Sequence, residues 1–322
     1  MPFRHEMLDA PLVAAIGDYD HTRDLATGSV TVDGVEFEIF ERPEDMFERA
    51  LEGEFAASEM SLAALSAMVS QGDDRFAALP VFPARSFRHG AIYVHVDGPR
   101  SVEDLASAQI GIPIWVQTAG VYVRGMLASR YGLDLTTITW VRAGVDVPGR
   151  EEPAPFDAGP HQILSAADRT LDELLLSREV DAVISARPPA SVERDDPRVR
   201  RLFDDPRAED EAYYRDTGVF PIMHAIVVRR DVLAREPRLA PELARAFTEA
   251  KDRALRRALA ATVPSYPLPW AATDARSVQA LLGDDFWPYG VDANEPTLRA
   301  FLADAHRQGL TDRLLEPSML FA

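Results

Sequence analysis

Two arginines and a histidine stand immediately before a strongly β-prone run of the chain. Arg85, Arg88 and His89 precede an apolar segment that ends at Val96. A guanidinium group binds a carboxylate through paired hydrogen bonds, and an imidazole titrates near neutral pH. A small acid at this point could be bound by arginine and protonated by histidine. If residues 87–91 are extended, Arg88 and His89 face opposite sides of the backbone, so one pocket can receive only one of them. We favour His89 for the chemistry.

Polar side chains at three other places could contact the same ligand. Asp18 and Arg23 follow one apolar strand-like segment, and Glu59 and Ser61 follow another. His224 lies within an apolar segment much later in the chain. Each of these residue types also has a common structural use, in a turn, a helix N-cap or a hydrogen-bonded core. The residue types alone leave both interpretations open.

The middle of the chain repeats this pattern of strand followed by polar residues. Gln117 and Thr118 stand where a strand gives way to a helix, whose first N–H groups can bind an anion. Arg187 ends a buried strand and is followed by two prolines, which suits a clamp for a carboxylate. A surface ion pair is the alternative for Arg187. No phosphate-binding glycine pattern, nucleophile elbow or metal-ligand spacing is present.

Composition excludes several classes of function. The 322 residues contain 34 Lys and Arg against 52 Asp and Glu, a net charge of −18, so nucleic acid and anionic membranes are not expected partners. The absence of cysteine excludes disulfides, thiol nucleophiles and zinc–thiolate sites. No apolar run is long enough to span a bilayer, and no basic start followed by an apolar stretch marks a secretory signal. We therefore expect a cytoplasmic protein.

Strands and helices alternate along the first two thirds of the chain, which predicts an α/β fold. The predicted strands are Leu12–Gly17, Val35–Phe40, Phe55–Met60, Leu79–Phe82, Ala91–Val96, Gln109–Pro113, Ile138–Val141, Ala182–Ser185 and Phe220–Val228. The predicted helices are Pro43–Glu52, a helix capped by Ser61, Thr118–Arg130, Leu171–Arg178, Ala240–Ala260, Thr273–Leu282 and Thr297–Gln308. Residues 144–162, rich in Pro and Gly, predict a long loop of the kind that often covers a site.

Two candidate crossovers, near 91–96 and 220–228, predict two lobes, the second inserted in the first. The first lobe is expected to comprise residues 1–96 and 217–322, and the second lobe residues 97–216. Such architectures bind ligands in the cleft between the lobes, at the ends of strands and the beginnings of helices.

Several of these segments, taken together, resemble the 4,5-dihydroxyphthalate decarboxylase family. The family is similar in fold to type II periplasmic solute-binding proteins, in agreement with the two-lobe prediction. His21 stands where we expect arginine and Ile114 where an acidic residue is frequent, so the exact substrate stays open. The resembling stretches cover nearly the whole chain and comprise residues 17–23, 57–62, 80–89, 117–119, 122–125, 186–188, 218–224 and 283–290.

The resemblance implies decarboxylation of a hydroxylated aromatic carboxylate such as 4,5-dihydroxyphthalate. A hydroxyl para to the carboxylate pushes electrons to the ring carbon, which is protonated before CO2 leaves. We assign His89 as the proton donor, with His224 as the alternate. Glu59 or Asp18 would act as a base or orient a histidine. No organic cofactor is required, because the phenol supplies the electrons.

The resemblance also implies one set of ligand-binding residues for a small anionic aromatic substrate. No metal is assigned, although a divalent ion at Asp18, Glu59 or a histidine stays open, as does a homo-oligomer. The alternative function is a non-catalytic binding protein for a small aromatic carboxylate, which would use the same cleft without releasing CO2. The expected binding residues are Arg23, Ser61, Arg85, Arg88, Gln117, Thr118 and Arg187.

Overall fold

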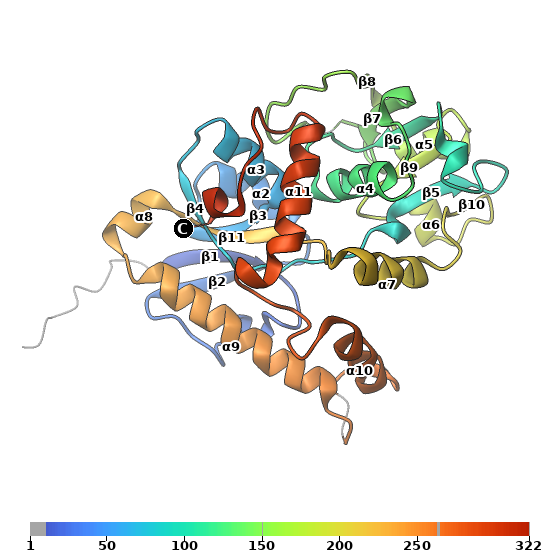
Figure 1. The fold of residues 1–322 in the computed structure, drawn as a ribbon. Helices are drawn as coiled ribbons and strands as arrows, with labels where there is room; N and C mark the ends of the chain where they lie inside the picture. The colour runs from blue at the N-terminus through green and yellow to red at the C-terminus, as the bar shows by residue number, and fades with distance from the viewer. Residues whose placement is uncertain (1–10, 150, 263–264, 322) are drawn as a thin grey trace, which may run out of the picture.

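The computed structural model describes residues 11–149, 151–262 and 265–321, which form two α/β lobes (Figure 1). The first sheet has the strand order β2-β1-β3-β11-β4. Its strands are β1 (Leu12–Gly17), β2 (Val35–Phe40), β3 (Ala57–Ser61), β4 (Phe76–Leu79) and β11 (His224–Arg229). β1 runs parallel to β2 and β3, whereas β11 is antiparallel to β3 and β4. Because β11 comes from the far end of the second lobe, that lobe is inserted in the first, as predicted.

The second sheet has the order β10-β5-β9-β6-β7-β8. Its strands are β5 (Ile92–His95), β6 (Gln109–Ile112), β7 (Thr139–Gly144), β8 (Gln162–Thr170), β9 (Ala182–Ile184) and β10 (Val199–Arg201). β5 pairs with β9 and β10, so the chain changes lobes before Ile92 rather than after residue 96, where we expected the boundary. The two crossing segments touch each other, since Arg85 and Ile222 form an antiparallel bridge.

Helices cover both faces of each sheet. The longer α-helices are α2 (Glu44–Leu51), α3 (Leu62–Ser70), α4 (Thr118–Ser129), α7 (Pro206–Thr217), α9 (Leu239–Leu259), α10 (Ala271–Leu282) and α11 (Glu295–Arg307). The shorter ones are α1 (Arg23–Ala26), α5 (Leu171–Leu176), α6 (Ala190–Glu193), α8 (Arg230–Arg235) and α12 (Pro317–Leu320). The 3₁₀ turns among the described residues are η1 (His89–Ala91), η2 (Glu103–Leu105), η3 (Leu135–Thr137) and η4 (Asp292–Asn294). No helix in the part of the chain that the structure describes is long and apolar enough to cross a membrane.

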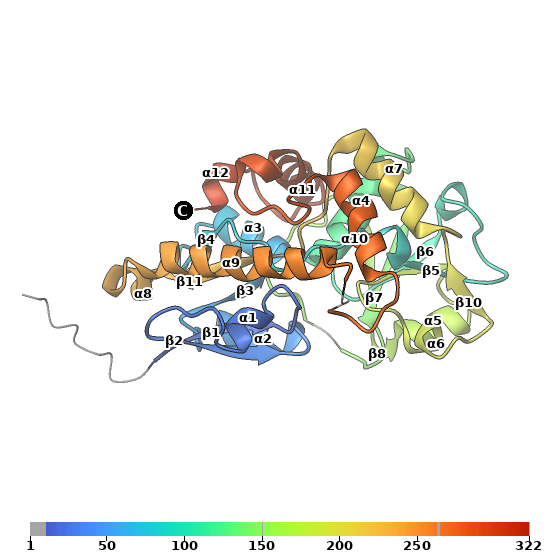
Figure 2. The ribbon, with the colours of Figure 1, turned by 90° about the horizontal axis from the view of Figure 1, so that it is seen from below.

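Strand alternation explains why the first sheet is covered on both sides. In β11, Ala225 and Val227 face a core shared with α3, whereas Ile226 and Val228 face a separate core shared with α9. β11 is therefore apolar at every position of its middle, as a strand buried on both faces must be. Figure 2 shows α9 running along this sheet.

One apolar core continues from the first lobe into the second. It contains side chains of α3 and β11 together with Ile110 of β6, Leu127 of α4 and Phe301 of α11. α11 follows the first sheet in sequence, yet it packs against both α3 and α4 (Figures 1 and 2). The C-terminal helices therefore join the lobes, and the cleft lies beside this junction.

Candidate active site

A cavity of about 590 Å³ lies where the two lobes meet. The first lobe contributes α2, the end of β3 and the start of β11, and the second lobe contributes the beginning of α4, the loop 145–161 and the segment after β9. Its polar and charged lining residues are Glu44, Glu48, Glu59, Ser61, Arg88, Gln117, Thr118, Glu151, Glu152 and His224. The cavity therefore lies at the ends of strands and the beginnings of helices, where the sequence predicted it.

Glu59 and His224 form a pair on neighbouring strands of the first sheet. The antiparallel register sets Ile226 opposite Glu59 and His224 opposite Ser61. The Nδ1 of His224 lies 2.9 Å from Oε2 of Glu59. A carboxylate only accepts hydrogen bonds, so Nδ1 carries the proton and Nε2 is free for a ligand. The Phe47 ring packs edge-on against the imidazole, with 5.0 Å between centroids.

The Glu59 carboxylate is fully buried and held on both oxygens. Its Oε1 accepts a 2.6 Å hydrogen bond from the backbone N–H of Gly17, and its Oε2 accepts one of 3.1 Å from the hydroxyl of Tyr19. Gly17 is the last residue of β1, which lies beside β3 in the sheet, and Tyr19 belongs to the turn that follows β1. Glu59 thus has a fixed position from which it orients His224.

Arg88 lines the same cavity without a carboxylate partner among the described residues. Its Nε donates to Sδ of Met223 at 3.3 Å, and its Nη1 reaches the carbonyl of Ala186 at 3.5 Å. Both acceptors are neutral and weak. Burial disfavours the charged form of the guanidinium and lowers the pKa of Arg88 to about 10. A desolvated guanidinium facing a cavity is a binding site for an anion.

Ser61, Gln117 and Thr118 also line the cavity, as predicted. The hydroxyls of Ser61 and Thr118 lie 2.9 Å apart and connect the beginnings of α3 and α4 across the two lobes. Thr118 also accepts a hydrogen bond from the N–H of Ala63. The Oε1 of Gln117 is buried without a partner among the described residues, so it is the freer of the three to bind a ligand.

His89 is not brought into the cavity. Residues 89–91 form the 3₁₀ turn η1 rather than an extended strand, and the imidazole is only 1% exposed. Its Nδ1 lies 2.5 Å from Oδ1 of Asp210, inside an aromatic cluster that includes Tyr213. Because of this turn, the Arg88 side chain lines the cavity, whereas the His89 side chain packs against α7. The preference for His89 over Arg88 at the ligand is corrected accordingly.

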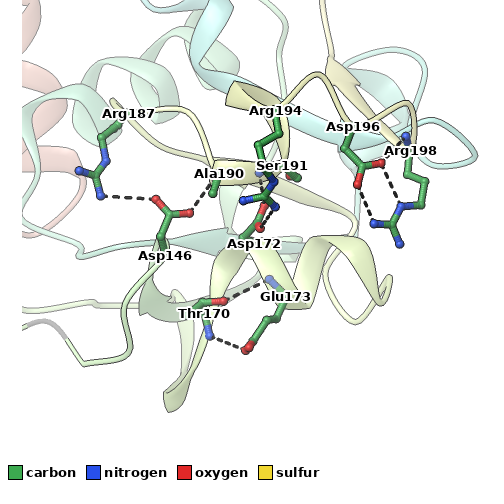
Figure 3. Close-up of polar contacts among 10 residues, drawn as sticks. All are labelled: Asp146, Thr170, Asp172, Glu173, Arg187, Ala190, Ser191, Arg194, Asp196 and Arg198. Carbon is green, nitrogen blue, oxygen red and sulfur yellow. Dashed lines mark hydrogen bonds and ion pairs between the residues drawn. The ribbon is translucent and has the colours of Figure 1, made fainter.

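Four further predicted residues lie outside the cavity lining. Asp18 is exposed, and Arg23 is on the surface beside Asp20. Arg85 is buried at the crossover, where it donates to Pro288 and Asn294, so its role is to fix the crossing segments. Figure 3 shows Arg187 beside Asp146.

Figure 3 explains why Arg187 does not clamp a ligand in the cavity. Its Nη2 lies 3.4 Å from Oδ2 of Asp146, and the other oxygen of that carboxylate accepts a 2.8 Å hydrogen bond from the N–H of Ala190. The guanidinium is 44% exposed. The alternative that the sequence left open, a surface ion pair, is the one observed.

The cavity also contains acids that the sequence did not single out. Glu152 accepts hydrogen bonds from the N–H groups of Trp115 and Val116, at 2.6 and 2.8 Å, and so holds the loop 145–161 against the start of α4. Glu44 and Glu48 line the cavity from α2. Their spacing of one helical turn is common on surface helices and carries no functional signal by itself. The described residues contain no group of three or more His, Cys, Asp or Glu that could hold a metal ion.

Curated proteins similar to this chain share one name. A 4,5-dihydroxyphthalate decarboxylase of Comamonas testosteroni is 36% identical over 315 residues, which cover 96% of both chains. A protein of the same name from Pseudomonas putida is 36% identical over 209 residues, 63% of this chain and 81% of its own. No family model matches the chain.

Solved structures similar to this one include proteins with the periplasmic-binding-protein fold and one enzyme. The aliphatic sulphonate binding protein SsuA of Escherichia coli matches with a TM-score of 0.55 at 14% identity, over 98% of this chain and 92% of its own. A Candida albicans gene product, described as having the generic periplasmic binding protein fold, matches at 0.52 and 12% identity, over 96% and 93%. The desulfurization enzyme DSZB matches at 0.53 and 16% identity, over 97% and 96%. The predicted fold is confirmed.

Proposed function

The chain belongs to the 4,5-dihydroxyphthalate decarboxylase family and is a carboxy-lyase, and from this premise we propose that its substrate is a hydroxylated aromatic carboxylate such as 4,5-dihydroxyphthalate. The observation that carries the assignment of roles is a single cavity that contains both the His224–Glu59 pair and Arg88, which has no carboxylate partner among the described residues. Decarboxylation of such a substrate requires that its carboxylate be bound and that its ring carbon be protonated.

The proposed reaction needs one proton and releases CO2. The hydroxyl para to the leaving carboxylate donates electron density to the ring carbon that bears it. That carbon takes a proton, which interrupts the aromatic ring. The carbon–carbon bond to the carboxylate then breaks, its electrons return to the ring, and aromaticity is restored. Because the phenol supplies the electrons, we propose that no organic cofactor takes part.

In this proposal Arg88 binds the carboxylate that stays on the ring. A cation on the leaving carboxylate would oppose CO2 loss, and Arg88 is the one arginine in the described lining, which contains no lysine. Nε2 of His224 delivers the proton, while Glu59 fixes the tautomer and supports the imidazolium. Gln117 offers an acceptor for a phenolic hydroxyl.

The test is CO2 release from a panel of hydroxylated aromatic carboxylates, before and after treatment with a chelator. His224→Asn is expected to lower kcat about 10²–10⁴-fold, as loss of a general acid does. His306→Asn is the matched control, since His306 is exposed on α11 outside the cavity. A His224→Asn enzyme within a few-fold of wild type, with activity lost in His89→Asn instead, would return the acid role to His89. Loss of activity on chelation that added metal restores would contradict the cofactor-free reaction.

The alternative of a non-catalytic binding protein is not favoured, because the curated relatives are named as enzymes. Intact recovery of every bound ligand in the CO2 assay would restore that alternative. A cytoplasmic location, a place in aromatic catabolism and a homo-oligomer stay predictions. Equilibrium sedimentation tests the last of these directly.

A further inference from the structure

The turn after β1 contains polar residues that could contact a ligand, yet none of its side chains lines the cavity. Tyr19 of this turn contacts the Glu59–His224 pair from outside the cavity. The Tyr19 hydroxyl donates to Oε2 of Glu59 at 3.1 Å, and this is the same oxygen that lies 2.9 Å from Nδ1 of His224. Tyrosine and histidine therefore share one acceptor atom.

Several features hold Tyr19 in this place. Gly17 lies beneath its ring, and a Cβ there would be 2.5 Å from Cζ of Tyr19. His21 stacks on the ring with 5.2 Å between centroids and 6° between planes. The His21 ring is fixed in turn by the carbonyl of Pro83, 2.7 Å from its Nε2, and by Trp287 at 4.9 Å. Because the Tyr19 ring is held in place by these contacts, its hydroxyl has a fixed position next to Glu59.

We propose that Tyr19 is a positioning residue that sets the proton affinity of His224 by competing for Oε2 of Glu59. This inference rests on the proposed role of His224 as the proton donor. A carboxylate oxygen that already accepts a hydrogen bond supports a neighbouring imidazolium less strongly than a free one. The tyrosine therefore keeps His224 from binding its proton too tightly, which favours delivery to the ring carbon.

The protonation state of Tyr19 agrees with this role. Burial and the adjacent Glu59 raise the pKa of Tyr19 well above its usual value. The hydroxyl therefore stays protonated at all working pH values and acts only as a donor to the carboxylate.

Other charged and titratable groups surround the pair and are left unchanged by the test. Glu44 interacts electrostatically with Tyr19, and Glu59 interacts electrostatically with His21 and Tyr289. The groups that share the cavity with His224 come from α2, the crossover and the loop 145–161, and they are Glu44, Glu48, Arg88, Glu151 and Glu152.

The test is Tyr19→Phe, read by NMR titration of the histidine side chains and by the pH profile of kcat. The resonance of His224 is identified as the one lost in His224→Asn. Tyr19→Phe is expected to raise the pH of half-titration of His224 by about 0.5–1 unit. This is less than the roughly 1–2 units of one hydrogen bond to a charged group, because Tyr19 acts on His224 only through Glu59. The limb of the pH profile that reports the acid should move by the same amount.

Tyr289→Phe is the matched control. The hydroxyl of Tyr289 is also buried and lies within the electrostatic influence of Glu59, but it has no hydrogen-bond partner among the described residues. Its removal should leave the titration of His224 within about 0.2 unit of wild type. An equal shift in both variants would assign the effect to general polarity and overturn the proposal.

Gly17→Ala provides a second route that keeps the tyrosine. Its Cβ would overlap the ring and hydroxyl of Tyr19 and so disturb the hydrogen bond to Glu59, and the shift should have the same sign as in Tyr19→Phe. No shift, or a downward shift, in the folded variants overturns the role of Tyr19. The NMR titration reports on His224 whether or not it is the proton donor. An upward shift in Tyr19→Phe, combined with a His224→Asn variant that stays active, would therefore refute the proposed acid role of His224 and leave the effect of Tyr19 on His224 standing.

Discussion

Arg88 carries a charge that costs stability in the empty protein, and we propose that this charge binds the ligand. It is largely buried, its hydrogen-bond acceptors are neutral, and its pKa is lowered to about 10 by burial. A cation in this state destabilises the empty protein, and a carboxylate ligand relieves that cost. Function and stability should therefore respond to its removal in opposite directions.

We expect Arg88→Leu to raise KM for the aromatic carboxylate about 10²-fold, because a charge-assisted pair is lost. The melting temperature should stay the same or rise. Arg88→Lys should recover only part of the binding, since an ammonium cannot form the paired hydrogen bonds of a guanidinium. Steady-state kinetics and thermal melts on the same preparations measure both effects.

Arg215→Leu is the control for this experiment. Arg215 is exposed on α7 and pairs with Glu211. Its replacement should change neither KM nor the melting temperature appreciably. If Arg88→Leu bound the substrate normally and melted at a lower temperature, Arg88 would be a structural residue.

At this scale the sequence identified segments that meet at the cavity, but not which side chain of each segment lines it. Glu59 and His224 were both candidates, yet their pairing depends on the register of β11 against β3, which joins residues 165 positions apart. The choice between Arg88 and His89 depended on residues 87–91 being extended. Residues 89–91 form a turn instead, and no residue type in Arg88-His89-Gly90 requires one conformation over the other.

At the scale of elements, the predicted strands and helices with clear apolar periodicity are present. β1 and β2 have the predicted bounds, and α9, α10 and α11 lie within two residues of theirs. β8 and α7 were not predicted. β8 has a largely exposed pattern, and α7 has no buried residue, so neither shows the periodicity on which such predictions depend.

The contact between α4 and α11 depends on one glycine. A Cβ at Gly125 would lie 2.0 Å from Oδ2 of Asp304. Alanine normally stabilises a helix interior relative to glycine, by up to about 1 kcal/mol. Here we expect the steric overlap with Asp304 to outweigh the higher helix propensity of alanine. Gly125→Ala should therefore lower the free energy of unfolding by about 1–3 kcal/mol in a denaturant titration.

The double variant Gly125→Ala, Asp304→Ala separates these two effects. Removing the carboxylate removes the overlap, so the glycine change should cost little or become favourable in that background. A double-mutant cycle with no coupling between the two sites would contradict a direct steric contact.

At the scale of the whole molecule, the two lobes share one hydrophobic core. Side chains of α3, α4 and α11 meet in it, and Tyr122 of α4 packs against Phe301 of α11 with 5.0 Å between ring centroids. The Trp115 indole also donates to the carbonyl of Gln308 at the end of α11. The chain order, with the second lobe inserted in the first, gives no hint that the last helices return to the second lobe.

This shared core predicts that the chain unfolds as a unit rather than lobe by lobe. Far-ultraviolet circular dichroism and tryptophan fluorescence should give coincident thermal transitions, with a calorimetric enthalpy close to the van't Hoff value. Phe301→Ala removes a fully buried ring at the junction and should split the transition as well as lower it. Leu174→Ala, in a core confined to the second lobe, should lower a transition that stays single. Two resolved transitions in the wild-type chain would show that α11 does not couple the lobes, and the cavity between them would then be free to open as the lobes move.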